Sequence, residues 1–202
     1  MIDDAGAGMS VQCPTCGASL IVPETYLVCA RGLLPEALRE GETVTPQGII
    51  RKLVINSKNW IPDCPQNIYE QIQRSLSEGT DKGETMRALT KRVQKEFRGV
   101  DEDRAYTIAH TEMLIAYGRW QFESLKLGGY EMKRWHTSDD ELVRPSHKAC
   151  GLQGAIPIDE PFSNGLMYPG DLGAGNTNEV IGCRCYLVSG DEEEEMTAED
   201  LL

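Results

Sequence analysis

Apolar residues recur at intervals of three and four along two stretches in the middle of the chain, residues 67–79 and 81–97. The repeating positions are Ile68, Ile72, Leu76, Met86, Leu89, Val93 and Phe97. This spacing puts each set on one face of a helix, so the pattern predicts two amphipathic surface helices. We expect Gly79 to end the first helix and Gly99 to end the second.

A third helical stretch, residues 102–127, is longer and carries an acidic residue inside its apolar face. Asp101 is placed to cap its N-terminus, and two glycines follow its last residue. The apolar positions are Ala105, Ile108, Ala109, Ala116 and Trp120. Glu112 falls in the middle of this set, so the pattern predicts a buried carboxyl group.

Glu112 needs a partner if it is buried, because an unpaired carboxylate inside a protein costs several kcal/mol. Arg104 and Arg119 lie about two turns away along the helix, beyond the usual reach of three or four residues. We therefore expect Arg144 or Arg184 to meet Glu112 from elsewhere in the chain. The alternatives are a protonated Glu112, or a helix rotated enough to leave Glu112 in solvent.

Beyond residue 129 the pattern changes from helical to alternating. The stretch "YEMKRWHT" (130–137) alternates as a strand, and "SDDE" follows as a turn. "LVRPSH" (142–147) is expected to continue extended, with its proline restricting it to a sheet edge or an exit. Residues 150–182 are rich in Gly, Pro, Asn and Asp and predict a long loop, after which "CRCYLVSG" (183–190) alternates as the last strand. The sequence thus predicts an α+β fold, with two or three amphipathic helices before a small antiparallel sheet that holds a long loop.

The first 60 residues are expected to form a separate segment that contains cysteines. Residues 1–10 are small and polar, which predicts disorder. The spacing of Cys13 and Cys16 is that of a zinc knuckle, with Cys29 as the next thiol, but a complete zinc ribbon needs a second pair. The alternative is a short hairpin with free thiols. Residues 46–60 contain a run of β-formers and predict a strand.

Composition and charge narrow the function classes. The net charge is −12, from 32 acidic and 20 basic residues, and residues 191–202 hold seven of the acids and no base. Such a run predicts a disordered acidic tail over 190–202, and the chain lacks the bulk basic footprint of a nucleic-acid-binding protein. No apolar run approaches the roughly 18 to 20 residues of a membrane span, and no secretory signal is recognisable. We therefore expect the seven cysteines to be reduced thiols or metal ligands inside the producing cell.

Acidic, basic and thiol side chains gather in "SDDELVRPSHKACG" (138–151) and in "GCRCYLV" (182–188). Three interpretations are open. The first is a buried network of ion pairs and hydrogen bonds that ties the long helix to the strands and pins the loop. Its members would be Glu112, Asp140, Arg144, His147 and Arg184.

The second interpretation is a zinc site. The ligands would be His147, Cys183 and Cys185, with Cys150 or Asp140 as the fourth. Alternate residues of a regular strand lie about 7 Å apart. The two thiols can therefore share one ion only if the chain bends between them, and Gly182 could allow that bend.

The third interpretation is a hydrolytic site, with His147 as the general base and Asp140 orienting it. A metal-dependent nuclease could also be assembled from Asp140, His147 and Glu112. Neither version has an identifiable nucleophile or a second carboxylate at a defined spacing.

Several motifs occur in an order that resembles a known family. "RAYTIAHTEMLIAYGRW" leads into "KRWHTSDDELVRPSHKACGLQG", then "PIDEPF" and finally "GCRCYLV". This order resembles the phage Mu F-like minor head protein domain of head morphogenesis proteins, over roughly residues 70–189. Two positions depart from the family pattern. His110 stands where the family usually has Arg, and Gly182 stands where it usually has Asn. If His110 is neutral at pH 7, one cation of the family's polar cluster is missing here.

The resemblance implies a minor virion component that acts in head morphogenesis and is not an enzyme. Its implied partners are the portal protein, the major capsid protein or both, and it leaves open a contact with packaged DNA. The implied location is the phage head, with the host cytoplasm during assembly, and no membrane contact is expected. The expected domain boundaries are 1–60, 61–189 for the Mu F-like domain, and 190–202. The alternative functions are a small metal-dependent nuclease or hydrolase that uses His147 and Asp140, and a zinc-ribbon-type adaptor.

Overall fold

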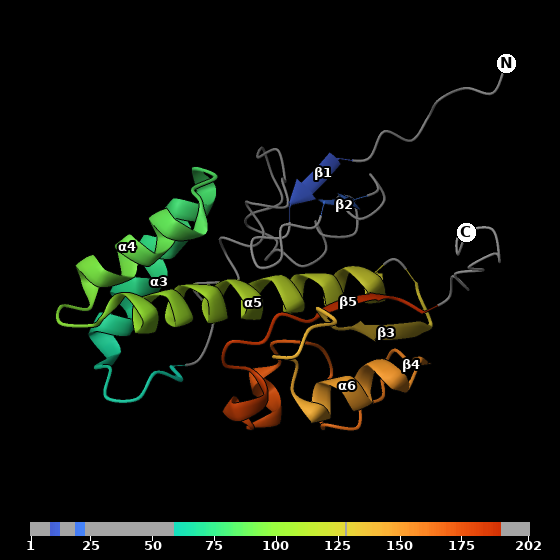
Figure 1. Cartoon of the computed structure of the whole chain (residues 1–202). Helices are drawn as coiled ribbons and strands as arrows, with labels where there is room; N and C mark the ends of the chain where they lie inside the picture. The colour runs from blue at the N-terminus through green and yellow to red at the C-terminus, as the bar shows by residue number, and fades with distance from the viewer. Residues whose placement is uncertain (1–8, 13–18, 23–58, 128, 191–202) are drawn as a thin grey trace, which may run out of the picture.

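A computed structural model of the chain describes residues 9–12, 19–22, 59–127 and 129–190 (Figure 1). Within these ranges the fold is α+β, as the sequence predicts, with four α-helices and a three-stranded antiparallel sheet. The helices are α3 (Gln66–Asp81), α4 (Met86–Glu96), α5 (Glu102–Leu127) and α6 (Pro145–Leu152). The strands of the sheet are β3 (Met132–His136), β4 (Ala155–Pro157) and β5 (Tyr186–Ser189), and two 3-10 helices, η3 (Leu172–Ala174) and η4 (Thr177–Glu179), precede β5.

Near the N-terminus, strands β1 (Met9–Gln12) and β2 (Ser19–Val22) form an antiparallel hairpin. The predicted disorder of residues 1–10 is therefore wrong for Met9 and Ser10. The predicted zinc knuckle at Cys13, Cys16 and Cys29 lies outside the described residues. So do most of the predicted strand over 46–60 and the acidic tail from residue 191.

Helix α5 lies between two hydrophobic cores, with α3 and α4 along its N-terminal part and the sheet and α6 beside its C-terminal part (Figure 1). Asp101 caps it as predicted, since its Oδ1 accepts a hydrogen bond of 2.7 Å from the Arg104 N–H. Its side chains in the first core are Ala105, Ile108, Ala109, Met113, Ala116, Tyr117 and Trp120. Those in the second core are Leu114, Ile115, Phe122 and Leu125. The middle of α5 is therefore buried on all sides, which is why a polar residue there must find a partner.

Gly79 lies inside α3 and does not end it, because the helix continues to Asp81. A Cβ atom at this position would lie 2.5 Å from Leu89 Cδ2 and 2.8 Å from Arg92 Nε. Glycine therefore serves here as the point where α3 and α4 approach each other closely. The predicted apolar faces of both helices hold, with Ile72, Leu76, Leu89 and Val93 buried.

The sheet has the strand order β4-β3-β5 and is antiparallel throughout. The edge strand β4 comes from residues 150–182, which were expected to form a long loop. The last strand begins at Tyr186, so Cys183, Arg184 and Cys185 precede it and do not belong to it. On the outer edge of β5, Gln121 of α5 binds both backbone groups of Leu187, with bonds of 2.9 and 3.2 Å. This side chain supplies the pairing that a further strand would give.

The stretch 142–147 does not continue as a strand. Pro145 is the first residue of α6, a position where the missing N–H costs nothing and the fixed φ suits a helix. The helix it begins places His147 and Cys150 on the buried side.

The loop that follows β4 packs directly on α5. A Cβ at Gly118 of the helix would lie 1.9 Å from the Pro169 carbonyl oxygen. Gly170, at φ +95°, would bring a Cβ within 2.9 Å of the Leu114 carbonyl oxygen. Two glycines, one on each element, thus allow backbone to lie against backbone.

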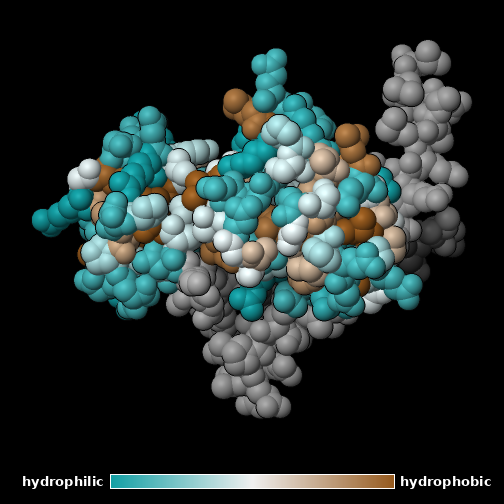
Figure 2. Space-filling view, turned by 90° about the horizontal axis from the view of Figure 1, so that it is seen from below, coloured by the Kyte–Doolittle hydropathy of each residue, from teal (hydrophilic) through white to brown (hydrophobic). Residues whose placement is uncertain are grey.

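The face in Figure 2 is largely hydrophilic, with apolar residues in small separate groups. Among the described residues the large hydrophobic side chains that stay exposed are Tyr106, Leu142 and Leu152. None of the helices described is long and apolar enough to cross a bilayer.

Candidate functional site

Glu112 is fully buried in α5, and two aromatic side chains donate hydrogen bonds to it. The Trp60 Nε1 atom lies 2.6 Å from Glu112 Oε1, and the Tyr69 hydroxyl lies 2.8 Å from the same oxygen. The burial agrees with the sequence pattern, whereas these donors come from the segment before α3 and from α3 itself. Sequence reasoning missed them, because a Trp and a Tyr in apolar surroundings read as core residues.

The two arginines expected to meet Glu112 bind elsewhere. Arg184 Nη2 lies 2.6 Å from Asp140 Oδ1, in a pair whose side chains are 31% and 38% exposed. Arg144 donates a hydrogen bond to the backbone carbonyl of Ile181. The expected partnership of Arg144 or Arg184 with Glu112 is thus corrected. Arg184 instead joins the segment before β5 to the turn that contains Asp140, and Arg144 joins the start of α6 to the same segment.

Thr111, the neighbour of Glu112, contacts a segment that lies on a different side of α5. Its hydroxyl oxygen accepts a hydrogen bond of 3.1 Å from the Gly182 N–H. These two adjacent residues therefore connect α5 to both parts of the fold. Glu112 contacts residues that precede α4, and Thr111 contacts the turn before β5.

His110 is also buried, beside the same turn. Burial, together with the nearby Arg184 guanidinium, lowers the pKa of His110 to about 4. The imidazole is therefore neutral at pH 7, so the charge that the family usually has at this position is missing from this chain.

His147 and two cysteines form a compact buried cluster. His147 Nδ1 lies 3.5 Å from Cys183 Sγ and 3.4 Å from Cys185 Sγ, and all three side chains are at most 3% exposed. The three potential ligand atoms lie within 4.8 Å of one another. The cluster joins two segments that are far apart in sequence, because His147 belongs to α6 and the two cysteines precede β5.

The two thiols of this cluster are unequal. The hydrogen bond with Cys183 and the contact with His147 lower the pKa of Cys185 to about 5, against the opposing effect of burial. The same bond and burial raise the pKa of Cys183 well above its ordinary value. The two sulfurs therefore differ in acidity, and Cys185 is the more acidic of the two.

On its other side the His147 ring faces Glu179, a residue that sequence reasoning missed. Glu179 Oε2 lies 3.0 Å from His147 Nε2, off the direction of a well-aligned hydrogen bond, and accepts a bond of 2.8 Å from the Ser146 hydroxyl. The only signal was an acidic residue four positions before Cys183. Cys150, proposed from sequence as a fourth ligand, is buried with its sulfur 3.5 Å from the Ser163 hydroxyl and outside the three-atom cluster.

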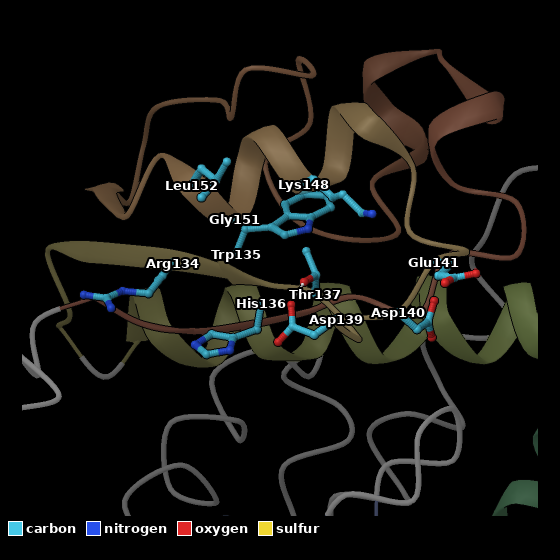
Figure 3. A pocket seen from close by; sticks show the side chains of 10 residues that line it. All are labelled: Arg134, Trp135, His136, Thr137, Asp139, Asp140, Glu141, Lys148, Gly151 and Leu152. Carbon is cyan, nitrogen blue, oxygen red and sulfur yellow. Dashed lines mark hydrogen bonds between the residues drawn. The ribbon is translucent and has the colours of Figure 1, made fainter. Parts of the chain in front are cut away.

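A pocket of about 760 Å³ lies next to this cluster, between β3, the turn after it and α6 (Figure 3). Its lining residues are Arg134, Trp135, His136, Thr137, Asp139, Asp140, Glu141, Lys148, Gly151 and Leu152. Several polar groups there already have protein partners. Asp140 binds Arg184, which lowers the pKa of Asp140 below its usual value, and the His136 ring stacks on Tyr186 with centroids 5.2 Å apart.

The acid–base pair that a hydrolase would need is not assembled. His147 directs its ring nitrogens to two sulfurs and to Glu179, and Asp140 directs its carboxylate to Arg184. Glu112 binds Trp60 and Tyr69, so it is not joined to this pair either.

These contacts describe an α+β domain in which buried polar and thiol groups connect segments distant in sequence. Residues 70–188, more than half of the chain, match the family model described as "Phage Mu protein F like protein". The chain therefore belongs to the phage Mu F-like family, a structural family of phage head-related proteins, which confirms the resemblance seen in the motifs. Comparisons with curated proteins and with solved structures give no significant match.

Proposed function

We propose that this protein is a minor component of a phage head and acts in head morphogenesis by binding the portal protein, the major capsid protein or both. The match of residues 70–188 to the Mu F-like family carries the proposal. The proposed location is the virion, after assembly in the host cytoplasm. The net charge of −12 opposes binding to phosphate, so any contact with packaged DNA would need a local basic patch.

A binding role without catalysis agrees with how the reactive side chains are used. Glu112, His147 and Cys185 are buried and contact other protein groups, and Asp140 is occupied by Arg184. Such contacts give a rigid body, which suits a component that must present fixed surfaces to its partners.

The first test is mass spectrometry of purified, salt-washed phage particles. The protein is expected in the particles in fewer copies than the major capsid protein. Co-expression with tagged portal or tagged capsid protein should then recover it with at least one of the two. If the protein is present in the lysate but missing from washed particles, the proposal is wrong.

A matched pair of variants tests whether catalysis is involved. Asp140→Asn weakens the half-exposed pair with Arg184, and Asp159→Asn weakens an equivalent surface pair with Lys126, which are 3.0 Å apart. A binding protein should yield equally infectious particles with either variant. Loss of infectivity with Asp140→Asn alone, at normal incorporation into particles, would instead support the hydrolase.

A further inference from the structure

We propose that His147, Cys183 and Cys185 together bind one thiophilic divalent cation, zinc in the cell, which fastens the turn before β5 to helix α6. This inference is independent of the proposed function, because it concerns how the domain is held together.

The spacing of the three ligand atoms fits a tetrahedral zinc ion. With Zn–S near 2.3 Å and Zn–N near 2.0 Å, sulfur and nitrogen ligands of one ion lie roughly 3.6 Å apart. The His147 Nδ1 atom lies 3.5 Å from one sulfur and 3.4 Å from the other. Both nitrogen–sulfur distances are thus close to the separation that a shared ion requires.

The backbone before β5 supplies the bend that a Cys-x-Cys motif needs for this geometry. Gly182 has φ +67°, in the region that favours glycine, and the Cys183 N–H binds the Val180 carbonyl oxygen at 3.1 Å in a tight turn. The Cys185 N–H then points back to Cys183 Sγ at 3.3 Å. The two sulfurs therefore lie within 4.8 Å of each other, closer than the roughly 7 Å of a regular strand.

Glu179 occupies the position of an outer partner for a metal-binding histidine. A histidine that binds metal through one ring nitrogen commonly directs the other to a carboxylate, which fixes the ring orientation. His147 would bind through Nδ1, and its Nε2 lies 3.0 Å from Glu179 Oε2, at ion-pair distance although outside hydrogen-bond alignment. The Ser146 hydroxyl donates to the same carboxylate oxygen and holds it in place.

The charge balance also favours a metal in this environment. The cluster is surrounded by apolar groups, among them the Trp135 ring, whose centroid lies 5.0 Å from that of His147. Two thiolates, a neutral imidazole and a divalent cation sum to zero charge, so the ion and its three ligands add no net charge to the buried cluster. Sulfur and imidazole ligands together select zinc over magnesium or calcium.

Metal content of matched variants provides the first test. The full chain is purified without chelator or added metal, as wild type and as Cys183→Ser, His147→Gln and Cys64→Ser. Cys64 is a buried cysteine of the first core, so its variant controls for the loss of a buried thiol. We expect the first two variants to contain about one equivalent of zinc less than Cys64→Ser. A chelator should lower the melting temperature of wild type and Cys64→Ser, but not of His147→Gln. Equal zinc in all four proteins overturns the proposal.

A second test covers the case in which those variants fail to fold, and it also excludes zinc held by the N-terminal cysteines. The double variant Cys13→Ser, Cys16→Ser changes no residue of a described helix or strand. We expect it to retain about one zinc, with X-ray absorption showing two sulfurs at about 2.3 Å and nitrogen at about 2.0 Å. A zinc-free protein, a shell of only oxygen and nitrogen, or a Cys183–Cys185 disulfide found by mass spectrometry would each refute the site.

Discussion

Replacing Tyr69 with Phe tests whether the hydrogen bonds to Glu112 stabilise the helical part of the fold. The change removes one hydroxyl that lies 2.8 Å from a fully buried carboxyl oxygen and leaves the aromatic ring, which is itself buried, in place. The apolar packing is therefore nearly unchanged, and any loss reports on the polar contact.

The magnitude depends on the charge of Glu112. A hydrogen bond to an ionised acceptor contributes about 1.5 to 3 kcal/mol net, and a bond between neutral groups about 0.5 to 1.5 kcal/mol. For a chain of this length, a loss of 1.5 to 3 kcal/mol lowers the melting temperature by roughly 3 to 12 °C. We expect a loss in the upper range, because Trp60 donates a second bond of 2.6 Å to the same oxygen, an arrangement that suits a carboxylate.

The assay is urea unfolding followed by circular dichroism, with Tyr106→Phe as the control. Tyr106 lies on the same helix as Glu112 but is 46% exposed, so its variant should change stability by less than about 0.5 kcal/mol. Combining Tyr69→Phe with Glu112→Gln completes a double-mutant cycle, in which the two losses should not add. If Tyr69→Phe is as stable as the control, or if the losses add fully, the reasoning fails.

Two further predictions concern the second core. Gly118→Ala should destabilise the protein by about 3 kcal/mol or more, because its Cβ would lie 1.9 Å from the Pro169 backbone oxygen. The control is Gly151→Ala in α6, where the nearest atom to the added Cβ would be 3.3 Å away. This variant should change the stability little or raise it slightly. Equal melting temperatures for these two variants would contradict the described packing. Burial lowers the pKa of Lys133 to about 8, from 10.5. The unfolded chain therefore holds this proton more tightly between these values, and stability should rise by roughly 1 to 3 kcal/mol from pH 8 to 10.5. Urea unfolding at each pH should show this rise in the unfolding free energy of the wild type but not of Lys133→Met. If the unfolding free energies of both proteins change with pH in the same way, Lys133 is not buried as described.

The helices α3, α4 and α5 and the small sheet after them followed from the sequence, because period and capping are local properties. Apolar spacing located the buried faces of α3 and α4, and Asp101 marked the start of α5. Pro145 was misinterpreted, since a proline that interrupts a strand and a proline that begins a helix look alike without knowledge of the next turn.

The site was predictable in composition but not in pairing. Glu112 was recognised as buried, yet its donors are Trp60 and Tyr69, whose N–H and O–H groups give no periodic signal. The bend that brings Cys183 and Cys185 together depends on a positive φ at the preceding glycine. A glycine in a sequence permits such a backbone conformation without requiring it.

Sharing α5 between two cores has a practical consequence for isolating the domain. The family match begins at residue 70, but Trp60, Ile61 and Tyr69 pack in the first core, and two of them bind Glu112. A fragment cut at the family boundary would lose these two donors to Glu112, whose helix α5 also supports the sheet. The smallest transferable unit should therefore begin no later than residue 59, and shorter fragments should aggregate or be degraded as a whole instead of losing one half.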